Sequence, residues 1–243
     1  MNEKYNISPD FNVMINLMES QLSKTTNQEE QLKQVQAINE MGRMLLEKNI
    51  TDHEVKVIKQ KVRSFDREEI DIQIIEPHNI ENNAPCLMFY HGGAFIIRGL
   101  EHHLRLAREY ALNVRCKVIY VDYRLALEFP FPKGVEDCYS ALKWVYANAN
   151  NLRIDTNRIA VVGDSAGGAL SAAVTQMARD RKEIPVCFQM LCYPVTDSRQ
   201  ITKSVEMFID TPIWNSPRNT MMWDVYLRNG DNRICFTNAS KIV

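Results

Sequence analysis

Four short and nearly unbroken apolar runs constrain the fold of this chain more than any other feature of its sequence. Such runs are typical of parallel strands that are buried on both faces of a sheet. Segments whose apolar residues recur at helical spacing lie between them. The alternation predicts an α/β fold, with a mostly parallel sheet and helices on both faces. The runs cover residues 86–90, 116–122, 159–163 and 186–193, and the helices are expected at 104–113, 135–149 and 165–180.

The chain before this pattern is organised differently. Apolar residues fall on alternate positions in residues 55–65 and again at Ile70, Ile72 and Ile74. This period of two is typical of strands, and the short polar gap between the two segments favours a hairpin. We therefore expect two antiparallel strands at the N-terminal side of the sheet.

Helical patterns flank the predicted sheet on both sides in the sequence. The first follows Ser8-Pro9, a typical N-cap and first-turn proline. The second spans about residues 28–48, and a third, rich in Met and aromatic residues, covers about 204–228. We expect N-terminal cap helices in residues 1–50, and an α/β core in residues 51–243 that contains the segment at 204–228 as a cap insertion.

Composition and charge exclude several classes of protein. The 29 basic side chains are matched by 30 acidic ones, so the net charge of −1 argues against a nucleic-acid binder. With 45% hydrophobic and 24% charged residues, the chain is typical of globular proteins. Its apolar stretches fall short of the roughly 20 residues that span a membrane. Because the mixed polar N-terminus also lacks the apolar core of a secretory signal, we expect a cytoplasmic protein.

Six cysteines occur without the paired C-x-x-C spacing of metal sites or redox motifs. Several lie inside apolar runs, where a free thiol packs as a small hydrophobic side chain. We expect buried, reduced thiols and neither a disulfide nor a bound metal. The six are Cys86, Cys116, Cys138, Cys187, Cys192 and Cys235.

Candidate chemistry concentrates where five of the nine glycines gather in two short motifs. The first motif, G-D-S-A-G-G at residues 163–168, follows a predicted strand and opens a predicted helix. In that context G-x-S-x-G is typical of a nucleophile elbow, a strained turn that holds a serine hydroxyl out of the end of the sheet. Ser165 is then the candidate nucleophile, with Asp164 as a supporting residue. The alternative is a tight strand–helix turn that carries an incidental serine.

The second motif, H-G-G-A-F at residues 91–95, follows another predicted strand. An attacked ester carbonyl becomes an oxyanion, which needs backbone N–H groups aimed at it. Glycines present such groups without side chains in the way, so Gly92 and Gly93 are candidate donors. Ala166, just after the nucleophile, is the third. We expect His91 to anchor this loop by hydrogen bonding rather than to act as a base.

Together these motifs resemble those of the hormone-sensitive-lipase-like family of α/β-hydrolases, also called the G-D-x-G lipolytic family. That family includes bacterial acetyl esterases and arylacetamide deacetylases. The resemblance covers about residues 55–226 and implies an α/β-hydrolase fold with a helical cap, and a serine carboxylesterase that cleaves short-chain acyl esters. Further matching blocks are V-D-Y-R-L-A at 121–126, F-P-F-P at 129–132, V-E-D at 135–137, L-K-W-V at 142–145 and Y-P at 193–194.

The sequence departs from the family pattern in two places. Ala94 replaces the usual third glycine of the oxyanion loop, a change that a backbone donor tolerates if its φ stays negative. Residues 126–130 read A-L-E-F-P where the family usually has A-P-E-H-P. We expect a change of shape at this segment and no loss of function.

The family also needs an acid and a histidine after its nucleophile. Neither expected block is present, and all five histidines precede Ser165: His53, His78, His91, His102 and His103. We expect a C-terminally truncated chain that lacks the catalytic Asp and His, so that hydrolysis is impaired. An uncovered sheet edge at 186–193 predicts self-association. We expect His102 and His103 to be solvated or to cap a helix, not to replace the base.

Two functions from different classes follow. The first is an esterase in which Ser165 attacks a small-molecule ester. The second is a non-catalytic hydrolase-fold remnant or small-molecule binding protein. Plant gibberellin receptors, which look like this family with the triad histidine lost, are a precedent for the second function. We expect no cofactor, metal or nucleic-acid partner in either case.

Overall fold

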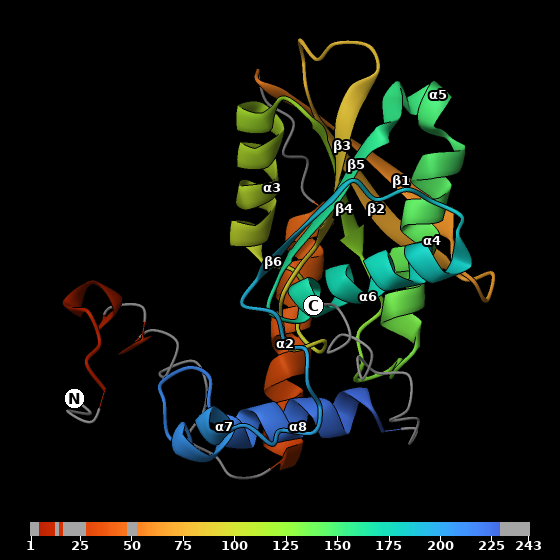
Figure 1. The fold of residues 1–243 in the computed structure, drawn as a ribbon. Helices are drawn as coiled ribbons and strands as arrows, with labels where there is room; N and C mark the ends of the chain where they lie inside the picture. The colour runs from red at the N-terminus through yellow and green to blue at the C-terminus, as the bar shows by residue number, and fades with distance from the viewer. Residues whose placement is uncertain (1–4, 13–14, 17–27, 48–52, 229–243) are drawn as a thin grey trace.

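The computed structural model describes residues 5–12, 15–16, 28–47 and 53–228 (Figure 1). Within these residues the strands are β1 (Val55–Arg63), β2 (Glu69–Pro77), β3 (Ala84–Tyr90), β4 (Lys117–Asp122), β5 (Ile154–Asp164) and β6 (Phe188–Cys192). They form one sheet in the order β1-β2-β4-β3-β5-β6. β2 pairs antiparallel with both β1 and β4, and the other neighbours are parallel. The predicted α/β fold, with a mostly parallel sheet and antiparallel N-terminal strands, is confirmed.

Helices cover both faces of this sheet, as the sequence predicts. They are α3 (Glu101–Val114), α4 (Lys133–Ala147), α5 (Ala149–Leu152) and α6 (Ala166–Arg181). Successive side chains of β3 point to opposite faces, so that Phe89 shares a core with α3, whereas Met88 and Tyr90 share a core with α4 and α6. Figure 1 shows α3 on one side of the sheet and α4 on the other. Because both faces are covered, β3 is apolar along its length, and so is β4 between Lys117 and Asp122 at its ends.

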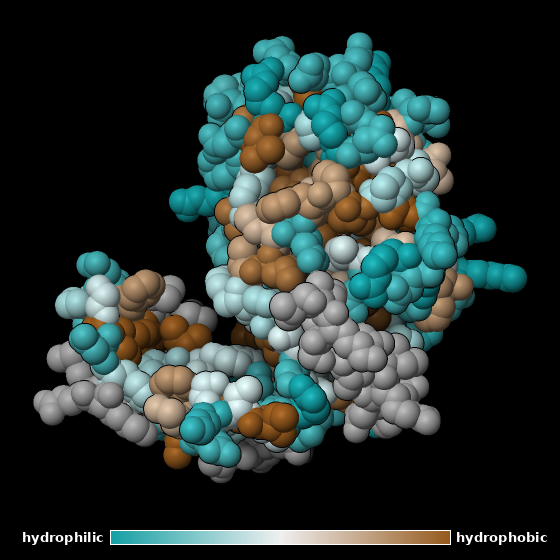
Figure 2. Space-filling view, viewed as in Figure 1, coloured by the Kyte–Doolittle hydropathy of each residue, from teal (hydrophilic) through white to brown (hydrophobic). Residues whose placement is uncertain are grey.

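The expectation of a buried last strand is wrong for β6. Among the described residues β6 pairs only with β5, and its side chains are half-buried or exposed. Phe188 is 61% exposed. Figure 2 shows hydrophobic side chains gathered on the face over this part of the sheet. An edge strand has a neighbour on one side only, so its side chains stay more accessible than those of the inner strands.

The free thiols divide between core and surface. Cys86, Cys116 and Cys138 are free thiols that are buried, as expected. Cys187 is exposed and Cys192 half-buried, so the expectation of burial is wrong for these two, which belong to the segment that enters and forms the edge strand. Cys235 lies outside the described residues.

The remaining helices come from the two flanking segments of the chain. They are η1 (Pro9–Phe11), α2 (Gln28–Glu47), α7 (Lys203–Met207) and α8 (Ser216–Tyr226). α2 confirms the helix expected at 28–48, whereas most of the helix expected after Pro9 lies outside the described residues. Figure 1 shows α2, α7 and α8 together at one end of the sheet.

α2 and α8 both contact the segment that follows β3. Asn39 on α2 donates from Nδ2 to the carbonyl oxygen of Ile96 (2.8 Å) and accepts from the backbone N–H of Arg98 (2.7 Å). On α8 the ring of Tyr226 stacks on Phe95 at a centroid distance of 3.9 Å. The helices outside the sheet therefore hold the loop that carries the H-G-G-A-F motif.

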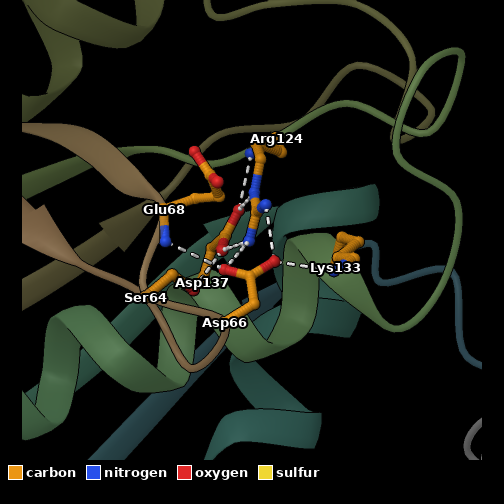
Figure 3. Close-up of polar contacts among 6 residues, drawn as sticks. All are labelled: Ser64, Asp66, Glu68, Arg124, Lys133 and Asp137. Carbon is orange, nitrogen blue, oxygen red and sulfur yellow. Dashed lines mark hydrogen bonds and ion pairs between the residues drawn. The ribbon is translucent and has the colours of Figure 1, made fainter.

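A buried ion-pair network explains two further sequence blocks (Figure 3). Arg124, just after β4, donates to Asp66 (2.8 and 3.1 Å) and to Asp137 on α4 (2.9 and 2.7 Å). Asp137 is fully buried and also accepts from the Ser64 hydroxyl. Hydrogen bonds from Arg124 and from Lys133 hold the pKa of Asp66 well below its usual range. The network ties the β1–β2 hairpin to the loop after β4 and to α4.

Candidate active site

Ser165 lies in a sharp turn between the end of β5 and the start of α6. Its backbone angles are φ 51° and ψ −115°, a region that residues other than glycine rarely adopt. The turn is held because Ser165 N–H donates to the carbonyl oxygen of Cys192 (2.9 Å), and Ser165 O accepts from the N–H of Val195 (3.2 Å). This is the strained strand-to-helix turn that the G-x-S-x-G motif predicts.

The two glycines of that motif are required by close backbone contacts. A Cβ atom on Gly167 would lie 1.9 Å from the carbonyl oxygen of Tyr90, at the end of β3. A Cβ atom on Gly163 would lie 2.3 Å from the carbonyl group of Gly167. Without side chains, α6 packs directly on β3 and β5. This contact brings Ser165 beside the loop that follows β3.

Ala166 is the first residue of α6, so its N–H has no acceptor inside the helix. The start of a helix carries a partial positive charge from the aligned peptide dipoles. An anion that develops next to Ser165 is therefore stabilised by the start of α6.

In the H-G-G-A-F loop, the N–H of the first glycine, Gly92, has a different partner from the one expected. The Gly92 N–H donates to Asp164 Oδ1 (2.9 Å), so the prediction that this N–H faces a substrate oxygen is wrong. A Cβ atom on Gly92 would lie 2.2 Å from Asp164 Oδ2, which explains the glycine. Gly92 therefore joins its loop to the residue that precedes Ser165.

The next residues of the loop form a tight left-handed turn. Gly93 has φ 123° and Ala94 has φ 54°, so the condition of a negative φ under which Ala94 was expected to replace glycine freely is not met. The turn is closed by the N–H groups of Ile96 and Ile97, which both donate to Gly93 O (3.0 and 2.7 Å). No described residue accepts a hydrogen bond from the N–H of Gly93 or Ala94. These two donors are left available in the loop.

His91 anchors this loop, as expected. Its ring is fully buried and stacks on Tyr123 at a centroid distance of 4.3 Å. Its Nδ1 donates to Gly92 O (2.6 Å), and the Tyr123 hydroxyl donates to His91 O (2.7 Å). Burial, together with the nearby His103, lowers the pKa of His91 to about 3. An imidazole in this position braces the backbone and does not serve as a base for Ser165.

His103 caps α3, which confirms the expected helix-capping role for this residue. Its Nδ1 accepts from the N–H of Leu100 (3.0 Å), while its own N–H donates to Leu100 O (3.0 Å). Its Nε2 lies 3.5 Å from Asp164 Oδ2. Burial acts to raise the pKa of Asp164, but contacts with His103 and the Gly92 N–H outweigh it and lower the pKa. The contact between Asp164 and His103 is a feature that the sequence patterns missed, and its only signal was a histidine soon after the oxyanion motif.

The hydroxyl of Ser165 has no base beside it in the described part of the chain. None of those residues lies within hydrogen-bond distance of its Oγ. Two of the carboxylates that follow Ser165 in the sequence are engaged elsewhere: Asp197 binds Arg199 (2.8 Å), and Asp210 accepts from Tyr5. The described residues thus hold no proton acceptor beside the Ser165 hydroxyl.

A cavity of about 510 Å³ lies between α2, α8 and the segment at residues 127–128. Apolar side chains of Leu127, Met221 and Val225 line it, together with the charged Glu128 and Arg228. Ser165 is not part of the lining. The residues that replace the usual A-P-E-H-P block therefore border a cavity at the helical end of the molecule.

The described residues show neither a metal cluster nor a membrane helix. No three His, Cys, Asp or Glu side chains among them are grouped so as to hold a metal ion. None of the helices that the structure describes is both long and apolar enough to cross a bilayer.

Comparison with known proteins relates this geometry to esterases. A family model described as "alpha/beta hydrolase fold" matches residues 87–239. Carboxylesterase NlhH of Mycobacterium tuberculosis is 42% identical over 145 residues, which are 60% of this chain and 46% of that protein. The structure of a bacterial heroin esterase is similar with a TM-score of 0.74 and 34% identity, covering 87% of this chain and 67% of that one. A hyperthermophilic esterase from Pyrobaculum calidifontis has a TM-score of 0.74 and 30% identity, covering 91% and 70%. The chain spans about half the length of the curated relatives that it matches.

Proposed function

Because the chain belongs to the alpha/beta hydrolase fold family, in its hormone-sensitive-lipase-like branch, we propose that it is a carboxylic ester hydrolase with Ser165 as nucleophile. One observation carries this proposal. A serine in a strained turn (φ 51°) lies at the start of α6, beside a loop with unpaired backbone N–H groups. The substrates are short-chain acyl esters, and the reaction requires no cofactor.

In the proposed reaction, Ser165 and the neighbouring backbone amides have different roles. Ser165 Oγ attacks the ester carbonyl carbon, and the carbonyl electron pair moves to the oxygen. The N–H groups of Gly93, Ala94 and Ala166 stabilise this oxyanion. When it collapses, the bond from the carbonyl carbon to the alkoxy oxygen breaks, and the alkoxide leaves as the alcohol after taking up a proton in place of the one that Ser165 gives to solvent water. The acyl group that remains on Ser165 is later released by water as the acid. Gly92 contributes by fixing the loop through Asp164, not by touching the substrate.

Proton transfer limits the rate of this chain. The Ser165 proton must leave as Oγ attacks, and all five histidines precede Ser165, with none beside its hydroxyl in the described residues. A serine without its base is a weak nucleophile. Turnover is therefore expected on the order of 10⁶ below that of a complete triad.

The helical end of the molecule serves as a cap over the site. Residues 1–50 and 204–228 supply α2, nearly all of α7, and α8, and α8 carries Met and aromatic side chains. The cavity of about 510 Å³ between α2 and α8 is large enough for a small acyl or alcohol group. Its apolar walls favour the hydrocarbon part of such an ester.

The alternative function is a small-molecule binding protein without catalysis. The observation that favours it is the same missing base next to Ser165. In that case the cavity binds a ligand that Ser165 never attacks.

Acetylation by p-nitrophenyl acetate separates the two functions. We expect the purified chain to release nitrophenol slowly and to carry one acetyl group on Ser165 by mass spectrometry, whereas Ser165→Ala shows neither above the blank. Ser171→Ala is the matched control, because Ser171 is a buried serine of the same helix whose Oγ has no partner. Equal rates for the chain and Ser165→Ala, without an acetyl adduct, would refute the esterase. Saturable ester binding in that case supports the binding protein.

Self-association belongs to the proposal as well. The exposed edge of β6, with Phe188 at its start, is expected to pair with a second copy. Light scattering after size-exclusion chromatography should show a concentration-dependent mass above that of the monomer, and Phe188→Lys should lower it. A monomer at every concentration contradicts this expectation.

Cytoplasmic location stays a prediction from the sequence, which cell fractionation tests.

A further inference from the structure

Two successive contacts lead from α3 to the oxyanion loop. His103, which is 5% exposed, lies with Nε2 3.5 Å from Asp164 Oδ2. The other oxygen of the same carboxylate, Oδ1, accepts from the Gly92 N–H (2.9 Å). Asp164 directly precedes Ser165, and Gly92 directly precedes Gly93. One carboxylate therefore joins the nucleophile turn, the oxyanion loop and α3.

The helix cap fixes which nitrogen of His103 faces Asp164 as a donor. The Leu100 N–H can only donate, so His103 Nδ1, which accepts from it at 3.0 Å, carries no proton. The proton of the ring is then on Nε2, the nitrogen that faces Asp164. The two ends of one imidazole thus serve two different partners, an amide of the cap and a carboxylate of the site.

The Asp164 carboxylate is also packed closely against Gly92. Its Oδ2 occupies the space where a Cβ atom of residue 92 would lie, at 2.2 Å. A displacement of Asp164 therefore moves Gly92, and the turn at Gly93 and Ala94 moves with it. Misplacing an oxyanion donor by about 1 Å costs on the order of 10²-fold in rate.

We propose that His103 is a positioning residue for ester hydrolysis: its Nε2–H holds Asp164 in the orientation that fixes Gly92 and thereby aims the oxyanion donors. This inference rests on the proposed function of Ser165. In this proposal a side chain of α3, which lies outside the two glycine motifs, sets the position of the oxyanion loop.

Two substitutions of His103 separate this role from helix capping. In His103→Asn the side-chain oxygen lies near the place of Nδ1, so the cap to Leu100 is kept and the donor to Asp164 is lost. In His103→Gln the side-chain amide reaches the place of Nε2, so the donor is kept and the cap is lost. His78→Asn, an exposed histidine at the end of β2, is the control for histidine loss.

The first readout is nuclear magnetic resonance and needs no turnover. In the unsubstituted chain, long-range ¹H–¹⁵N spectra should show the His103 proton on Nε2, and the Gly92 amide proton should resonate downfield because it bonds a carboxylate. We expect His103→Asn to move the Gly92 signal upfield and His103→Gln to leave it nearly in place. A purely structural cap predicts the opposite order, with His103→Gln the more disturbed.

The second readout is the rate of Ser165 acetylation by p-nitrophenyl acetate. We expect His103→Asn to slow it by about tenfold or more, His103→Gln to retain most of it, and His78→Asn to leave it unchanged. The proposal is overturned if the Gly92 signal and the acetylation rate of His103→Asn match those of the unsubstituted chain. If Ser165 is never acetylated, the esterase proposal fails, and the Gly92 signal still decides whether His103 positions the loop.

Discussion

Gly167→Ala is expected to destabilise the fold by about 4 kcal/mol or more. The new Cβ atom would lie 1.9 Å from Tyr90 O and 2.7 Å from His91 C. Both are backbone atoms, so rotating a side chain cannot relieve the clash. α6 must instead move away from β3, which breaks close packing along the helix. A loss of this size removes a large part of the roughly 5–15 kcal/mol that stabilises an ordinary domain.

Urea denaturation followed by far-ultraviolet circular dichroism measures this loss. Gly168→Ala is the matched control, because its Cβ atom would have its nearest neighbours at 3.1 Å, on Gly163 O and Pro194 Cβ. The gain in helix propensity partly offsets that tighter contact, so we expect a change within about 1 kcal/mol. A Gly167→Ala midpoint equal to that of the unsubstituted chain would show that α6 and β3 are not packed as described.

Arg124→Met is expected to cost about 3–5 kcal/mol. Arg124 bridges Asp66 and the fully buried Asp137, and the substitution leaves the Asp137 carboxylate without its cation. An unpaired buried charge is costly because the protein interior solvates it poorly. The hairpin, the loop after β4 and α4 should loosen together, since the network joins all three.

An exposed ion pair provides the control for Arg124→Met. Arg179 pairs with Asp180 at the surface, with side chains 59% and 63% exposed, so Arg179→Met should change the stability by less than about 1 kcal/mol. Similar urea midpoints for the two variants would mean that the network contributes no more than a surface pair.

The same network predicts the acid dependence of stability. The pKa of Asp66 is lower in the folded chain than its ordinary value, mainly because Arg124 donates to it. The stability from this pair is therefore fully present above the ordinary carboxyl pKa of about 4, and is lost as the pH falls below it. We expect the urea midpoint to drop between neutral pH and about pH 3, and to drop less in Arg124→Met. An unchanged slope in that variant would contradict the assignment.

Much of the sheet could be predicted from the sequence, because its strands are buried on both faces. The runs that form β3 and β4 are nearly unbroken apolar segments, and such a pattern has few other solutions in a globular chain. β6 shows the limit of that inference. Its run is also apolar, yet the strand lies at the edge of the sheet, and strand order is decided by pairing between distant segments.

The turn at Ser165 was predictable for a local reason. Glycines two positions before and after the serine are needed where α6 crosses β3 and β5. The requirement is therefore visible in the sequence as a motif of five consecutive residues. The oxyanion loop was only partly predictable. Its glycines marked the loop, but the direction of each N–H depends on contacts such as that of Gly92 with Asp164.

By itself the sequence determined the α/β fold, the strained serine and its neighbouring amide loop, because periodicity and glycine placement act over short stretches of chain. Only the tertiary structure decided that Gly92 serves Asp164 and that His103 reaches the same carboxylate. It also decided that Arg124 joins three separate segments. The physical reason is that a polar side chain binds the groups that tertiary packing brings within hydrogen-bond distance. These groups come from distant segments, so no local sequence pattern predicts them.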